Sequence, residues 1–172
     1  KPSVHLGTLV PTSEGTRSYV QGSIMDLYRG EPLLIVYGTA SRDMAMNDAI
    51  KRMATKVSYW LMPGSNMEFG SVPMVSDREL TAEQVSRHNL FLIGNIQQNR
   101  VTRRLMSRMQ VRESVSGGKR VLDGAGKQYA LDGRGYGFIQ PNPEAPKRLI
   151  HVWASADAGY YHIPDIIMPM VP

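Results

Sequence analysis

Five small polar residues stand where apolar segments of this chain end, and they are the first candidates for binding chemistry. They are Thr39, Ser41, Asp77, Asn95 and Asn142. In layered α/β folds the carboxyl ends of the strands are where ligands bind. If a helix begins after Ser41, its unpaired N–H groups could hold an anion. We therefore predict that these loops form the ligand-binding site, for a small anionic or sugar ligand, if the chain binds one.

Two acidic residues, Asp43 and Asp77, each follow a predicted strand and could act together. Carboxylates on neighbouring strand ends can coordinate a cation or form an acid–base pair. Capping of the following helix explains an aspartate at such a position equally well.

Histidine and cysteine usage gives no support to metal or nucleophile chemistry. The four histidines are widely spaced, and none stands in a metal-binding pair such as His-Glu-x-x-His. The absence of cysteine excludes disulfides and thiolate ligands. His151 alternates with apolar neighbours, which is typical of a residue within a sheet. We predict no metal site, no cofactor and no catalytic residue in this segment.

The glycine-rich segments lack the spacing of the phosphate and nucleophile motifs. Segment 124–128 has no upstream glycine at the Walker spacing and has glutamine where a hydroxyl should meet magnesium. Segment 133–137 lacks the dinucleotide spacing and precedes a predicted strand. No Gly-x-Ser-x-Gly pentapeptide is present to expose a serine nucleophile on a strained turn. We therefore interpret the glycines of 124–128 as a turn.

Arg100, Arg104 and Arg108 are spaced four residues apart, so a helix would carry them on one face. Such a stripe can bind phosphates, but no aromatic residues alternate with it to stack on bases. The net charge of +5 arises from 20 basic residues mixed with 15 acidic ones. We interpret the stripe as a solvated or domain-docking face and predict no nucleic-acid partner.

The elements that position these residues follow from hydrophobic periodicity. Continuous apolar runs predict strands covered on both faces. Met46, Ile50, Met53 and Val57 recur at three- and four-residue steps, which predicts a helix with one buried face. Asp-Gly turns between short runs predict two or three small antiparallel strands. The predicted strands are 33–37, 72–75, 89–94, 136–140 and 148–154, the main helices are 43–61, 81–88 and 99–109, and the small strands lie within 110–131.

Alternation of strands and helices at this spacing implies right-handed crossovers. We therefore predict an α/β fold with three layers: a mostly parallel sheet with helices on both faces, of the flavodoxin- or Rossmann-like type, and a small β-hairpin insertion near 110–131. A chain of 172 residues that is 42% hydrophobic suits one domain, which we assign to 31–172. The Gly-, Ser-, Thr- and Pro-rich residues 1–30 are predicted to be an extended arm from an upstream domain.

Four motifs together resemble a known kind of protein region. They are Val36-Tyr37-Gly38-Thr39, Ser76-Asp77-Arg78-Glu79-Leu80-Thr81, Asn89-Leu90-Phe91-Leu92-Ile93-Gly94 and Gly137-Phe138-Ile139-Gln140-Pro141-Asn142-Pro143. From residue 22 onward the chain resembles the non-catalytic α/β region that accompanies the α/β-hydrolase domain in large bacterial esterase- and peptidase-like proteins. The resemblance implies a secreted or periplasmic parent enzyme that hydrolyses esters, such as those of plant polysaccharides. Its Ser-His-Asp residues would lie outside this segment, and no functional residue carries over.

The leading hypothesis is therefore an accessory domain without an active site of its own. It would pack on its own catalytic domain or on another subunit, or form a homo-oligomer, with the arm 1–30 and the apolar tail 163–171 making the contacts. The alternative is a flavodoxin-like module that binds a small ligand at the strand-end loops, and an independent enzyme is the third hypothesis. No run of about eighteen apolar residues is present, so we predict no membrane partner.

Overall fold

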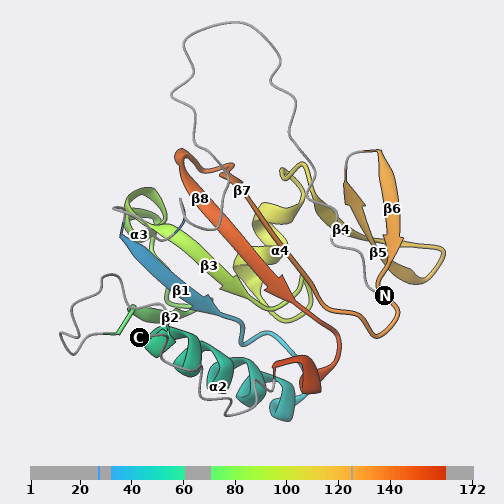
Figure 1. Cartoon of the computed structure of the whole chain (residues 1–172), viewed down its shortest axis with the longest axis horizontal. Coiled ribbons are helices and arrows are strands. Elements are labelled where there is room, and N and C mark those ends of the chain that lie inside the picture. The colour runs from blue at the N-terminus through green and yellow to red at the C-terminus, as the bar shows by residue number, and fades with distance from the viewer. Residues whose placement is uncertain (1–26, 28–31, 61–70, 125, 162–172) are drawn as a thin grey trace, which may run out of the picture.

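The computed structural model describes residues 27, 32–60, 71–124 and 126–161 (Figure 1). Its centre is a five-stranded sheet in the order β2-β1-β3-β8-β7. Strands β2, β1, β3 and β8 are parallel, and β7 runs antiparallel to β8 at one edge. The strands are β1 Leu33–Tyr37, β2 Met74–Ser76, β3 Asn89–Ile93, β7 Tyr136–Asn142 and β8 Ala145–Ala154.

Strands β1 and β3 form the centre of the sheet because nearly all of their side chains are apolar. All five residues of β3 are buried, as are the three middle residues of β1. Val36 pairs with Leu92, and Ile35 pairs with Phe91. Successive side chains point to opposite faces, so a continuous apolar run is needed where both faces are covered. The strands predicted at 33–37 and 89–94 are confirmed to within one residue.

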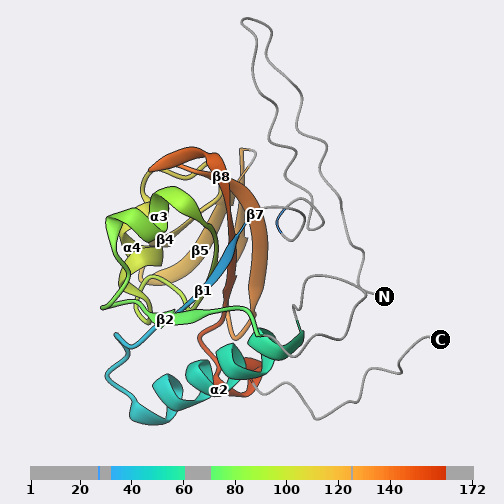
Figure 2. The same ribbon diagram turned by 90° about the vertical axis from the view of Figure 1, so that its left-hand side faces the viewer.

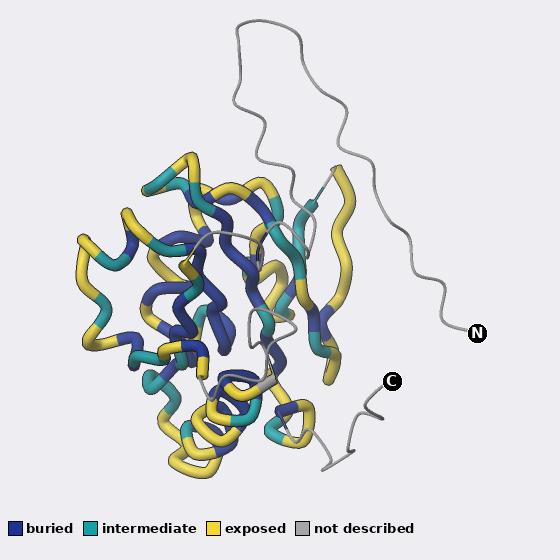
Figure 3. Tube along the Cα trace, turned by 60° about the vertical axis from the view of Figure 1, so that its left-hand side comes forward, coloured by how far each residue is buried: buried dark blue, intermediate teal, exposed yellow. Residues whose placement is uncertain are grey.

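Helix α2 (Met44–Trp60) and the 3₁₀ helix η1 (Ala158–Tyr161) cover one face of the sheet. The buried residues of α2 recur at three- and four-residue steps, so one side of the helix faces the strands. They include Met46, Ala49, Ile50, Met53, Ala54 and Val57, and they form one core cluster with Ile35, Phe91, Ile93 and Tyr161. Figure 3 shows the buried residues along the strands and on the inner side of this helix. The amphipathic helix predicted at 43–61 is confirmed.

Helices α3 (Ala82–Arg87) and α4 (Arg100–Met106) cover the other face, as Figure 2 shows. A capping box begins α3, because Thr81 and Gln84 each accept a hydrogen bond from the other's backbone N–H group. Asn99 caps α4. The second core cluster includes Leu34, Val36, Val85, Leu90, Leu92, Val101, Leu105, Ile150 and Val152.

A separate antiparallel sheet has the order β4-β5-β6. Its strands are Arg112–Ser116, Lys119–Gly124 and Lys127–Ala130. Gly117 and Gly118 join β4 to β5 with φ of 58° and 77°, and a two-residue turn of this hand requires positive φ at both positions. The small antiparallel strands predicted within 110–131 are confirmed.

The predicted three-layer, flavodoxin- or Rossmann-like fold is wrong. The described residues contain eight strands and only three α-helices, arranged in one mixed sheet and one antiparallel sheet. After α4 the chain adds no further strand–helix unit but forms the small sheet and then the β7–β8 hairpin. Only Pro143 and Glu144 separate β7 from β8, and so short a connection joins antiparallel strands but cannot contain a crossover helix. The fold is mixed α/β and rich in strands.

The arm 1–30, apart from Leu27, and the tail 163–171 lie outside the described residues. Leu27 is buried, and its carbonyl accepts a hydrogen bond of 3.0 Å from Asn89 Nδ2. The helix predicted at 99–109 ends earlier, at Met106, because tight turns follow it.

A row of aromatic rings crosses the α2 face of the sheet. Phe91 of β3 stacks on His151 of β8 with ring centroids 4.4 Å apart and an interplanar angle of 8°. Trp153 lies next along β8, 6.2 Å from His151, and meets Tyr160 edge-on. His151 is only 9% exposed, which confirms the prediction of a sheet residue. Burial lowers the pKa of His151 to about 4, because the charged imidazolium would lose its water.

Acid is expected to destabilise the fold through His151. Its pKa is about 4 in the folded chain against an ordinary value of 6.5, so between these values the unfolded chain binds a proton that the folded chain does not. The contribution is complete above pH 6.5 and is lost as the pH falls toward 4. From pH 7 to pH 5 the free energy of unfolding should drop by about 2 kcal/mol from this residue.

Urea unfolding of the wild type and of His151→Phe at both pH values measures this contribution. The phenylalanine of the variant can still stack on Phe91 but cannot bind a proton. Its free energy of unfolding should therefore fall by about 2 kcal/mol less than that of the wild type between pH 7 and pH 5. The same pH dependence in both proteins would show that His151 is not the acid-sensitive group.

Candidate functional site

Thr39 and Asp77 meet at the carboxyl edge of the parallel strands. Thr39 follows β1, and Asp77 follows the neighbouring strand β2. The backbone N–H and the hydroxyl of Thr39 both donate to Asp77 Oδ1, at 3.1 and 2.6 Å. The Asp77 N–H donates to the carbonyl of Tyr37 at 2.9 Å. The structure therefore brings these two predicted residues together, in contact with each other.

Arg100 completes this cluster from the first residue of α4. Its backbone N–H donates to Asp77 Oδ2 at 2.7 Å, and its Nη1 lies 3.1 Å from the same oxygen. The Asp77 side chain has no exposed surface, whereas 42% of the Arg100 side chain is exposed. Both carboxylate oxygens of Asp77 thus accept hydrogen bonds, Oδ1 from Thr39 and Oδ2 from Arg100. Asp77 holds the loops after β1 and β2 to the start of α4.

Ser41 and Asp43 lie at the start of α2 and act as caps. Ser41 Oγ accepts from the Asp43 N–H at 3.1 Å, and Asp43 Oδ1 accepts from the Ala45 N–H at 2.9 Å. The Asn47 side chain accepts from the Ser41 N–H and donates to its carbonyl. These contacts support capping as the role of Asp43. Asp43 and Asp77 serve different elements, and their hydrogen bonds do not join them into an acid–base pair.

Asn95 belongs to a buried network whose other members the sequence patterns did not single out. Its Nδ2 donates to the carbonyl of Ser155 at 2.9 Å, and its Oδ1 accepts from the Gln97 N–H at 2.8 Å. Gln98 Nε2 donates to the same Ser155 carbonyl. The Tyr161 hydroxyl donates to Gln98 Oε1 and accepts from the Ser155 N–H, both at 2.8 Å. Burial raises the pKa of Tyr161, so its phenol remains a donor.

Asn142 is not brought to the other four predicted residues. Strand β7 is antiparallel to its neighbour, so its last residue, Asn142, pairs with Ala145 at the beginning of β8. Its Oδ1 accepts the Glu144 N–H at 2.9 Å within the hairpin turn. The expectation of a shared edge depended on a parallel strand, and the hairpin places Asn142 at the opposite end of the sheet.

The crevice between the ends of β1 and β3 is closed by the chain itself. Asn99 has no exposed surface, and its Nδ2 donates to the carbonyls of Val36 and Ile93 at 3.1 and 3.0 Å. The Ala40 N–H donates to the carbonyl of Gln98 at 2.8 Å. Strand-end groups of this kind are the ones that ligands contact in parallel sheets. Here they are bonded to the loop that follows β3.

Gly38 allows the two loops to approach this closely. A Cβ atom at this position would lie 2.8 Å from the carbonyl carbon of Gln98 and nearer still to its oxygen. Real Cβ atoms essentially never approach other atoms so closely. The glycine after β1 is therefore required for packing of backbone against backbone, and the loop it begins does not surround an open anion site.

A second buried carboxylate, Glu113 of β4, joins the small sheet to the main sheet. The Tyr136 hydroxyl of β7 donates to Glu113 Oε2 at 2.6 Å, and Arg120 of β5 forms an ion pair with Oε1. The Glu113 side chain has no exposed surface. Burial and the neighbouring negative charge raise the pKa of Tyr136, so it also remains a donor. No spacing or neighbour in the sequence distinguished Glu113 from the other acidic residues.

The arginine stripe predicted on one helix face is used within the chain. Arg100 pairs with Asp77, as described above. Arg104 and Arg108 both pair with Glu144 in the β7–β8 turn, and half of each arginine side chain is exposed. Arg104 thus links α4 to the hairpin, and Arg108 does so from the turn that follows the helix, beyond the face on which the stripe was predicted. The exposure of both side chains agrees with the interpretation of a solvated face.

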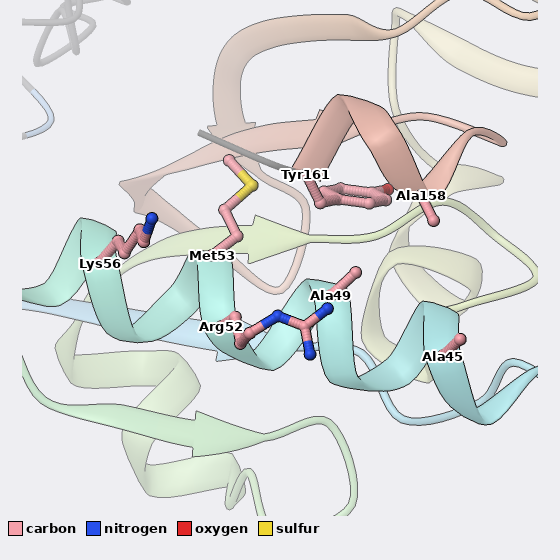
Figure 4. A pocket seen from close by; sticks show the side chains of 7 residues that line it. All are labelled: Ala45, Ala49, Arg52, Met53, Lys56, Ala158 and Tyr161. Atoms are coloured by element: carbon pink, nitrogen blue, oxygen red, sulfur yellow. The ribbon is translucent and has the colours of Figure 1, made fainter. Parts of the chain in front are cut away.

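A pocket of about 230 Å³ lies on the other face of the sheet, between α2 and η1 (Figure 4). Its lining residues are Ala45, Ala49, Arg52, Met53, Lys56, Ala158 and Tyr161. None of the five predicted site residues belongs to it. The two alanines, four residues apart on one helix face, were the only sequence signal for a hollow at this position.

Within the described ranges, no group of three or more histidine, aspartate or glutamate side chains could hold a metal ion. No helix of these ranges is long and apolar enough to cross a membrane. No model of a protein family matches the chain, and no curated protein matches it at a significant level.

Proposed function

We propose that this chain is an interaction domain: the accessory, non-catalytic part of a multidomain bacterial hydrolase of the esterase or esterase/peptidase-like kind. One observation carries the proposal. The crevice at the ends of β1 and β3, where a parallel sheet binds ligands, is filled by Asn99 and bonded to Gln98. The outer surfaces are thus left for binding a partner. The same closure counts against the alternative of a flavodoxin-like module with a ligand at these loops.

The small sheet offers a surface for the partner. Val115 and Tyr129 are 58% and 54% exposed although they are large and apolar. They lie on the same face of the small sheet as Glu113 and Leu122, because Leu122 pairs with both Glu113 and Tyr129, and Val115 pairs with Arg120. Glu113 and Leu122 pack toward the main sheet, so Val115 and Tyr129 form the exposed margin of a face that is otherwise covered. Exposed apolar side chains that extend beyond a covered face can contribute to an interaction site. The motif resemblance supports the α/β-hydrolase domain of the same polypeptide, or another subunit, as the partner.

The isolated 172-residue chain is expected to leave 4-nitrophenyl acetate unhydrolysed, whereas the intact native polypeptide should hydrolyse it. The intact mass of that polypeptide shows first whether Lys1 is an internal residue. Hydrolysis by the isolated chain at the rate of the intact protein would overturn the proposal.

Calorimetric titration of the isolated chain with the remainder of the polypeptide tests the choice of surface. Tyr129→Asp should weaken binding about tenfold or more, because it places a charge in a contact that excludes water. Tyr59→Asp is the matched control, since Tyr59 is a 65% exposed tyrosine on α2, and it should bind like the wild type. Equal binding by both variants would remove the small sheet from the contact.

A further inference from the structure

Strand β6 is an edge of the small sheet, and no other described strand pairs with its outer side. All four of its residues are exposed, and in Figure 1 it lies on the side of the small sheet farther from the main sheet. The opposite edge, β4, is joined to the main sheet through Glu113. Both edges of the main sheet carry a proline, Pro141 within β7 and Pro73 directly before β2. Proline protects an edge strand from pairing with another chain, and β6 has none.

The hydrogen bonds between β5 and β6 show which backbone groups point outward. The Leu131 N–H donates to the carbonyl of Arg120 at 3.0 Å, one step beyond the last paired residues of the two strands. In an antiparallel pair, opposite residues alternate between those that exchange both backbone hydrogen bonds and those that exchange none. Counting back from Leu131, Tyr129 is therefore bonded to β5. Gln128 and Ala130 direct their N–H and C=O groups to the outer edge.

Two copies of β6 can satisfy these outward groups with each other. If Gln128 of one copy lies opposite Ala130 of a second, antiparallel copy, all the outward N–H and C=O groups of both strands are paired. This register is the one in which both outward residues find partners within the strand, and it is symmetric about a two-fold axis. It places Tyr129 of the two copies opposite each other. These tyrosines, 54% exposed in one copy, would form a cross-strand aromatic pair.

Charges at the two ends of this pairing are complementary. The register brings Lys127 opposite Leu131 of the second copy, next to Asp132 of that copy. Lys127 and Asp132 are both exposed, and neither forms an ion pair with another described residue. The two-fold axis repeats this pair of opposite charges at the other end, so a second copy fits the edge in charge as well as in hydrogen bonding.

We propose that two copies of this chain associate through β6 as a symmetric dimer. The three strands of each small sheet then form one continuous antiparallel sheet across the two-fold axis. The contact uses the edge of the small sheet, whereas the function proposed above uses the margin of one face, and only Tyr129 belongs to both. The dimer therefore does not depend on a hydrolase partner.

Sedimentation velocity of the isolated 172-residue chain tests the dimer in the absence of any other domain. The contact is small and each copy has a net charge of +5, so we expect a weak dimer with a dissociation constant of about 100 µM. Ala130→Pro removes an outward N–H but no bond to β5. Urea unfolding should show that this variant folds, while its dimer becomes undetectable. A wild type that stays monomeric at about 500 µM, or a folded proline variant that dimerises like the wild type, would overturn the proposal.

Exchange of charges tests the register with variants that keep the backbone of β6. Lys127→Glu and Asp132→Lys each place like charges together and should each weaken the dimer about fivefold. The double variant restores opposite charges and should dimerise like the wild type. Lys51→Glu is the matched control, since it makes the same change of charge at an exposed position of α2, and it should not weaken the dimer. A double variant as weak as the single ones would contradict the proposed pairing.

Discussion

Replacing Asn99 by alanine is expected to lower the free energy of unfolding by about 4 kcal/mol, because four hydrogen bonds are lost at a fully buried position. The carbonyls of Val36 and Ile93 lose the donor that closes the crevice. The N–H groups of Val101 and Thr102 lose the cap of α4. Each bond contributes roughly 1 kcal/mol, and buried groups left without partners add to the loss. Urea unfolding followed by circular dichroism measures the change.

Asn99→Asp separates the two roles of this side chain. An aspartate keeps the oxygen that caps α4, but its second oxygen faces two carbonyl oxygens and repels them. We expect most of the loss seen with alanine to persist at pH 7. Thr81→Ala is the matched control, because it removes an exposed cap from α3 and should cost only about 1 kcal/mol. A loss in Asn99→Ala no larger than that of Thr81→Ala would show that closure of the crevice contributes little.

Gly38→Ala is expected to lower the free energy of unfolding by about 3 kcal/mol. The added Cβ would overlap the backbone carbonyl of Gln98, which is itself held by the Ala40 N–H. Backbone cannot turn aside as a side chain can, so the loops after β1 and β3 must separate. The separation would strain the Asn99 hydrogen bonds as well. Thermal and urea unfolding of the variant measure the cost.

Two other glycines provide controls for this substitution. Gly135→Ala would meet the ring of Tyr160, a partly exposed side chain that can move, so a smaller loss of about 1 kcal/mol is expected. Gly137 lies in β7 with no contact nearer than 3.4 Å, so alanine should be tolerated there or should add a few tenths of a kcal/mol. Equal stability of the Gly38 and Gly137 variants would mean that the two loops are not tightly packed.

Closure of the crevice by Asn99 lowers the affinity that a ligand could reach at the ends of β1 and β3. A ligand at the ends of β1 and β3 would have to displace Asn99 and give up bonds that contribute about 4 kcal/mol together. That cost corresponds to nearly a thousandfold loss in affinity. The surfaces outside the crevice have no such cost, which is why we propose the small sheet as the interaction surface.

Local patterns in the sequence were sufficient where one segment alone decides the structure. The apolar runs of β1 and β3, the three- and four-residue period of α2 and the Thr81 capping box each depend on residues close in the chain. The same holds for the small antiparallel strands, whose turns need glycine. His151 was also identified as a sheet residue from its apolar neighbours alone.

The candidate site could be predicted only in part, because its contacts join distant segments. The loops after β1 and β2 converge at Thr39 and Asp77, as expected for parallel neighbours. Arg100, which forms the ion pair with Asp77, is 23 residues away from it in the sequence. The two carbonyls to which Asn99 donates likewise come together only because β1 and β3 are adjacent in the sheet.

The sequence by itself determined the central strands, the amphipathic helix and the polar residues that follow the strands, because burial and capping act over a few residues. Only the tertiary structure decided that the segment after α4 forms a second sheet and a hairpin in place of further strand–helix units. The two-residue turn at Pro143 and Glu144 reversed the last strand, and this moved Asn142 away from the predicted site. Packing between loops also decided that the strand-end crevice is closed, since Gly38, Gln98 and Asn99 meet only when β1 and β3 lie side by side.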